Sequence, residues 1–199
     1  MSSAPTPVQQ EILACAARLI VEDGFEYGPA KQQAIKQLGL PARTALPSND
    51  FLEEAVIEYI DIFCADTQPQ ELRTLREIAA RWMQLMQEFT PFLSGAVWHG
   101  TATRHSDIYL QLFCDDSKMA EIFLINQNKK YLTGDASGPG GHTIPALTTW
   151  ETVPEWQQRV NIHMAVYDFD HIRGALTPDS KGRAPRGNLE AVRQLLLVD

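Results

Sequence analysis

The stretch that decides the fold is Gly95-Ala-Val-Trp-His-Gly-Thr-Ala-Thr-Arg-His-Ser-Asp-Ile-Tyr-Leu-Gln-Leu-Phe113. Its first five residues form a short apolar run that leads into Gly100 and predicts a strand. From Asp107 onward polar and apolar residues alternate, which is typical of a strand with one buried face. The stretch therefore predicts the start of a sheet, with Asp107 and Tyr109 on the same face of one strand.

Before this stretch, residues 1–90 carry the apolar stripes of amphipathic helices. Gly24 is placed to end the first helix, and Ser48 or Asn49 to cap the third, whose first turn is rich in acidic residues. The pattern predicts a helical N-terminal region with helices over 9–22, 29–38, from the cap at 48 or 49 to about 64, and 69–89.

After this stretch, short alternating runs predict further strands. A turn-rich segment at 137–141 separates two of them, and a Gly/Pro-rich loop over 174–188 precedes the last helix. The expected strands are 130–133, 146–152 and 159–167, with helices over 118–126 and 188–197. The fold class is therefore predicted as α+β: a helical region over 1–90, packed on a small mixed β-sheet domain over 91–199.

Composition excludes several classes of protein. The 199 residues are 44% hydrophobic and 21% charged, which is typical of a globular chain and excludes a wholly disordered one. The net charge is −8, and residues 1–90 account for −6 of it. Double-stranded DNA is therefore not an expected partner, because binding to its phosphates needs clustered Lys and Arg.

The sequence also indicates a location in the cell. Its first residues have neither the basic nor the apolar part of a secretory signal, and no apolar run approaches the length of a membrane span. Cys15, Cys64 and Cys114 lie far apart and form no disulfide pattern, so we expect buried thiols. We therefore expect a cytoplasmic protein with no membrane partner.

The pairs Gly100-Thr101 and Ser106-Asp107, separated by a short basic turn and followed by the alternating strand, resemble the signature of the DNA polymerase β-like nucleotidyltransferase superfamily. The layout is also similar to that of small bacterial nucleotidyltransferase-like proteins. The resemblance implies transfer of a nucleotide from a nucleoside triphosphate with Mg²⁺. It implies that Asp107 is the catalytic metal ligand, and that the nucleotide phosphates lie against Gly100, Thr101, Arg104 and Ser106.

The sequence departs from that signature at the metal site. Tyr109 stands where the second metal-binding carboxylate is expected, and the strand over 159–167 offers Asn161 and His163 in its middle. Asp168, at the end of that strand, is the remaining candidate for a second metal ligand. Binding of a nucleotide without turnover, as in a pseudoenzyme, is therefore an equal expectation.

Two alternatives from other classes remain. The first is a catalytically inactive protein-interaction module, whose acidic helical half would face a basic partner. The second is a TetR-like regulator, because residues 11–25 resemble the first helix of those repressors. Its recognition helix would fall between Pro41 and Pro47, and two prolines in so short a segment argue against a helix.

The candidate residues also have purely structural interpretations. Asp107 could cap the turn before its strand, and Gly100 could serve a tight turn. Asn161 and His163 share a strand face, so cross-strand hydrogen bonds would explain them as well as a pocket would.

Overall fold

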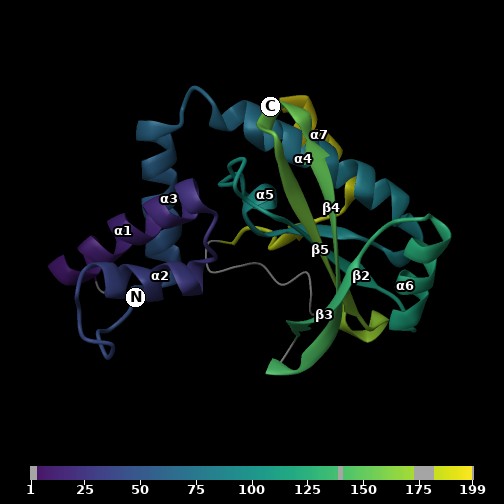
Figure 1. The fold of residues 1–199 in the computed structure, drawn as a ribbon, viewed down its shortest axis with the longest axis horizontal. Helices are drawn as coiled ribbons and strands as arrows, with labels where there is room; N and C mark the ends of the chain where they lie inside the picture. The colour runs from purple at the N-terminus through teal and green to yellow at the C-terminus, as the bar shows by residue number, and fades with distance from the viewer. Residues whose placement is uncertain (1–3, 139–140, 173–181, 199) are drawn as a thin grey trace. The chain divides into compact units, whose positions relative to one another are not determined.

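The computed structural model describes residues 4–138, 141–172 and 182–198, and these form two compact units (Figure 1). The helical unit consists of Met1–Glu71 and Thr101–Ser106, and the sheet unit consists of Leu72–Gly100 and Asp107–Asp199. Helices and a six-stranded mixed sheet confirm the α+β class. Pro139 and Gly140 of one predicted loop, and residues 174–181 of the other, lie outside the described residues.

Local capping fixes both ends of the first helix and the start of the third. Thr6 accepts a hydrogen bond from the Gln9 N–H and completes a capping box. Gly24 ends the first helix at φ +70°, and the Ser48 hydroxyl accepts from the Phe51 N–H. The helices are α1 (Pro7–Asp23), α2 (Tyr27–Gln37), α3 (Asn49–Phe63) and the first turn of α4 (Gln68–Leu85).

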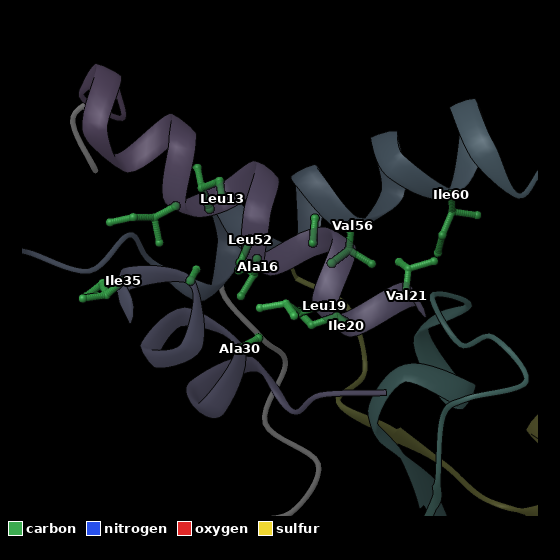
Figure 2. Close-up of a cluster of buried hydrophobic side chains, with 13 residues drawn as sticks. Leu13, Ala16, Leu19, Ile20, Val21, Ala30, Ile35, Leu52, Val56 and Ile60 are labelled. Atoms are coloured by element: carbon green, nitrogen blue, oxygen red, sulfur yellow. The ribbon is translucent and has the colours of Figure 1, made fainter. Parts of the chain in front are cut away.

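One apolar cluster holds α1, α2 and α3 together (Figure 2). Each helix contributes the residues of its inner stripe, at the three- and four-residue spacing of a helix face. Ile12, Ala16, Ala30, Leu52 and Val56 are 0% exposed. Replacing a leucine of this kind by alanine typically lowers the free energy of unfolding by about 2–5 kcal/mol, so the cluster contributes substantially to the stability of this unit.

The sheet unit has a parallel pair at its centre. β2 (Ile108–Phe113) runs parallel to β5 (Gln158–Tyr167), with Ile108 opposite Ile162, and every other pairing is antiparallel. The strand order is β3-β4-β5-β2-β1-β6. The remaining strands are β1 (Phe92–Ser94), β3 (Leu132–Ser137), β4 (Thr143–Val153) and β6 (Arg186–Gly187).

One face of this sheet is apolar and carries helices. Ile108, Ile162 and Met164 are 0% exposed there, as the alternation of their strands predicted. The Trp82 indole of α4 donates to Glu151 Oε1 of β4 at 2.6 Å, which fixes α4 against the sheet. The other helices of the unit are α5 (Gly95–His99), α6 (Ser117–Asn126) and α7 (Leu189–Val198). The opposite face carries the polar positions of the same strands.

Two strand predictions need correction. Residues 95–99, expected as a strand, form α5, and the strand is β1 just before them. Gly95 at φ +72° turns the chain out of β1, and Val97 is then buried by the helical turn that follows. β3 spans Leu132–Ser137 rather than 130–133, because pairing with β4 extends it.

Other expectations are met. Residues 41–47 contain no helix, which agrees with the argument against a recognition helix between the two prolines. Asp116 caps α6 by accepting from the Lys118 N–H, and Asn188 caps α7 by accepting from the Ala191 N–H. Within the described residues, no helix has both the length and the apolar character that crossing a bilayer requires.

The three cysteines are free and partly buried, so they are less deeply buried than expected. Burial raises the pKa of the Cys64 and Cys114 thiols. Both therefore stay protonated, and so weakly nucleophilic, over a wider pH range than an exposed thiol.

Tyr59 gives the helical unit a testable response to alkaline pH. Its hydroxyl donates to Glu22 Oε1 at 2.5 Å, and burial together with this bond raises the pKa of Tyr59 to about 12. Because the pKa of Tyr59 in the folded protein lies above the unfolded value of about 10, its protonated hydroxyl stabilises the fold fully below pH 10. This contribution to the free energy of unfolding is lost as the pH rises to about 12.

We expect Tyr59→Phe to remove the part of the stability loss at alkaline pH that comes from this hydroxyl. Urea unfolding at about pH 9 and about pH 11 measures it, and equal pH dependence in both proteins would contradict the assignment.

Candidate functional site

Asp107 is the centre of a polar cluster on the sheet face opposite α4. Its Oδ1 accepts a hydrogen bond from Asn161 Nδ2 at 3.2 Å, and its Oδ2 lies 3.0 Å from His163 Nε2. Asp107 directly precedes β2, and the parallel register places Asn161 of β5 beside it. The Asp107 and His163 side chains are 32% and 30% exposed, so solvent reaches both. Asp107 is therefore accessible to a ligand, but both of its oxygens already have protein partners.

His163 carries this network to a third strand. Its Nδ1 lies 2.9 Å from Thr148 Oγ1 on β4, and the Tyr109 ring stacks on the imidazole with centroids 4.9 Å apart. When Nε2–H donates to the carboxylate, Nδ1 is left as the acceptor for the Thr148 hydroxyl. We call Asp107, Tyr109, Thr148, Asn161 and His163 the Asp107–His163 cluster. The cross-strand hydrogen bonds expected for His163 are thus present, and they converge on the predicted site residue.

The cluster can be compared with what a magnesium site requires. Mg²⁺ takes hard oxygen ligands, usually one or two carboxylates together with substrate phosphates. Here one carboxylate is present, and the nearest polar groups are N–H and O–H donors. Among the described residues, no group of three or more His, Cys, Asp or Glu side chains could hold a metal ion. The cluster therefore suits an uncharged or hydrogen-bonding ligand group better than a divalent cation.

Asp168 does not join Asp107. Because β2 and β5 are parallel, Asp107 lies at the start of the pair, and Asp168 follows Tyr167 at its far end. Seven residues of strand separate Asp168 from Asn161, or about 23 Å at 3.3 Å per residue. The Asp168 carboxylate accepts a hydrogen bond from the Asp170 N–H instead. One ion cannot contact both carboxylates, so the pairing expected from sequence is wrong.

The predicted phosphate-binding residues fall in both units. Gly100 belongs to the sheet unit, where it ends α5 at φ +89° and donates to the Ala96 carbonyl at 2.9 Å. Its role in ending α5 therefore explains the glycine at this position without a role in phosphate binding. The glycine that directly follows a strand and opens a helix is Gly95, five residues earlier. Sequence reading missed it because a five-residue helix has no visible period.

Thr101, Arg104 and Ser106 belong to the helical unit, in the segment Thr101–Ser106. Thr101 is 6% exposed. The Ser106 hydroxyl accepts from the Thr103 N–H at 3.0 Å, and the Arg104 N–H donates to Glu71 Oε2 at 2.9 Å. Arg104 and Ser106 therefore have a structural role in the segment, and the role of all three residues toward phosphate stays a prediction.

Arg186 is one of the basic residues of the predicted loop over 174–188, whose positive charge suggested either a contact with phosphate or a solvated loop. It stands in β6, and the strand register places it in one row across the sheet with Ser94, Tyr109 and His163. Its guanidinium donates to Gln111 and lies over the Phe113 ring, with 5.8 Å between the guanidinium carbon and the ring centroid. Nε is buried and has no hydrogen-bond partner within the described part of the chain. A two-residue strand after a long loop gives no sequence signal, so only the structure could place Arg186 in this row.

Comparison with known proteins identifies no relative: no protein-family model, no curated protein and no solved structure matches the chain.

Proposed function

We propose that the sheet unit binds a nucleotide at the Asp107–His163 cluster, without a metal ion and without transferring it. One observation carries the proposal: both oxygens of Asp107 are engaged by side-chain donors, from Asn161 and His163. A metal-dependent transferase would need a second carboxylate where Tyr109 stands. The site residues therefore favour recognition through hydrogen bonds over metal-assisted chemistry.

Three features of the cluster fit a nucleotide. The partly exposed rings of Tyr109 and His163 are surfaces beside which a base can stack. Thr148 and Asn161 supply hydroxyl and amide groups for its polar edges. Arg186, in the same row of the sheet, supplies a fixed positive charge for phosphate, which a site without metal must obtain from protein groups.

The test is thermal unfolding of the full chain against ATP, GTP, CTP and UTP, each in EDTA and in Mg²⁺. We expect at least one nucleotide to raise Tm equally in both, by the equivalent of about 2.7 kcal/mol at a hundredfold excess over Kd. The ligand-induced shift should fall in Tyr109→Leu and in Arg186→Gln. Arg193→Gln on α7 is the matched control, because it removes the same charge outside the row and should leave the shift unchanged.

The same experiment can contradict the proposal in two ways. A shift that requires Mg²⁺, disappears in Asp107→Asn and accompanies pyrophosphate release would identify a working nucleotidyltransferase. Failure of all four nucleotides to shift Tm would exclude nucleotide binding at this site.

A further inference from the structure

The helical unit carries an open groove between α1 and α3, with a volume of about 550 Å³. Leu13, Ala14 and Ala17 of α1 line one side of it, and Phe51, Ala55 and Phe63 of α3 line the other. The lining is mostly apolar, and its volume falls within the range of about 300–1,000 Å³ that is usual for binding sites. The groove lies wholly within one compact unit and is separate from the Asp107–His163 cluster.

Helix α3 is apolar on two stripes: the first is fully buried in the core, and the second, with Phe51 and Ala55, packs against the edge of the core and is partly buried. Leu52, Val56 and Ile60 are at most 7% exposed and belong to the core cluster. The second stripe leads along the groove to Ile62 and Phe63, which are 63% and 66% exposed. Neighbouring large apolar side chains at such exposure mark interaction surfaces more often than scattered ones do.

The charge around the groove indicates the chemistry of its occupant. Glu54 and Glu58 line it, and no basic side chain does among the described residues. The helical unit as a whole carries 5 basic and 11 acidic residues, a net charge of −6. A field of one sign around an apolar groove attracts an oppositely charged partner and orients it on approach.

We propose that this groove docks a basic amphipathic helix of a partner protein. From Phe51 to Phe63 the groove follows α3 for about 18 Å, which matches a helix of about 12 residues at 1.5 Å per residue. The apolar residues of the partner helix, at positions i, i+3, i+4 and i+7, would contact Phe51, Ile62 and Phe63. Its Lys or Arg side chains would lie toward Glu54 and Glu58.

The test uses two labelled synthetic peptides and the full chain. Both peptides have leucine at i, i+3, i+4 and i+7 of a helix, and their flanking positions are all lysine in one and all glutamate in the other. Fluorescence anisotropy should give the lysine peptide at least about tenfold higher affinity. Phe63→Ser and Ile62→Ser should each lower the affinity for the lysine peptide by about tenfold, as expected for contacts near the centre of an interface. Both side chains are exposed, so circular dichroism should be unchanged.

Matched variants separate the groove from general attraction to an acidic protein. Glu54→Gln with Glu58→Gln should weaken the lysine peptide and reduce the salt dependence between about 50 mM and about 300 mM NaCl. Glu11→Gln with Asp66→Asn removes the same charge from the same unit outside the groove and should have a clearly smaller effect. Ile122→Ser, on the exposed face of α6, is the apolar control.

Three outcomes would overturn the proposal. The first is equal affinity for both peptides, and the second is undiminished binding by Phe63→Ser. The third is a dimer in sedimentation velocity that dissociates in Phe63→Ser, because a second copy would then be the occupant. None of these outcomes bears on nucleotide binding by the sheet unit, so the two proposals can fail separately.

Discussion

Gly24→Ala is expected to lower the free energy of unfolding by about 3 kcal/mol. Gly24 ends α1 at φ +70°, a conformation that costs a residue with a Cβ roughly 1–2 kcal/mol. A Cβ there would also collide with the backbone carbonyl oxygen of His105, and overpacking of this kind adds about 1–3 kcal/mol. The carbonyl cannot move freely, because Thr103 Oγ1 donates to the Val21 carbonyl at 3.0 Å and holds the segment Thr101–Ser106.

Gly39→Ala is the matched control for this prediction. Gly39 also has a positive φ, +65°, but a Cβ there would meet no atom within 4 Å. Gly39→Ala should therefore lower the free energy of unfolding only through the unfavourable backbone conformation, by about 1–2 kcal/mol. Urea unfolding followed by circular dichroism compares the two variants. Equal losses would show that the segment Thr101–Ser106 does not press on Gly24 in solution.

Phe113→Ala is expected to lower the free energy of unfolding by about 3–5 kcal/mol, the usual range for truncating a buried phenylalanine. Phe113 is 0% exposed at the end of the central strand β2. Its ring lies edge-on to Phe92 at 5.7 Å and stacks on Tyr167 at 5.3 Å, so it joins β1, β2 and β5. Truncation would leave a cavity beside the Phe92 and Tyr167 rings, whose strands are fixed by their hydrogen bonds.

The corresponding exposed residue provides the control. Phe63→Ala removes the same ring from a side chain that is 66% exposed and should change the free energy of unfolding by no more than about 0.5–1 kcal/mol. Chemical denaturation of both variants measures the difference. A loss below about 2 kcal/mol for Phe113→Ala would mean that the strands repack around the missing ring.

The sequence predicted the elements whose pattern is local. Alternation over Asp107–Phe113 and over residues 159–167 assigned Asp107, Asn161 and His163 to polar strand faces, and the structure confirms this. The helix starts at Ser48 and Asn188 could also be predicted from the sequence, because an N-cap depends on residues within four positions of it. The short helix α5 could not be predicted, since five residues are too few to distinguish a helix from an apolar strand.

The candidate site depended on information that no local pattern holds. Because β5 lies parallel to β2, His163 lies beside Asp107 and Asp168 lies at the far end of the strand pair. The direction in which two strands pair is a property of the whole chain and not of a local pattern. Arg186 joins the row through β6, which pairs with only two residues of β1. The sequence could therefore indicate Asp107 and a polar strand face, but not which side chains would surround the carboxylate.

The parallel pair at the centre of the sheet also constrains how the chain acquires its structure during synthesis. β1 can pair with one edge of β2 soon after both are made, but the other edge of β2 pairs with β5, where Ile108 lies opposite Ile162. At roughly 10 residues per second, the ribosome delivers β5 about five seconds after β2. During that interval the edge of β2 that pairs with β5 has no partner strand, and contacts so distant in sequence slow folding. The nascent chain therefore has a period in which binding by a chaperone would protect β2 from aggregation.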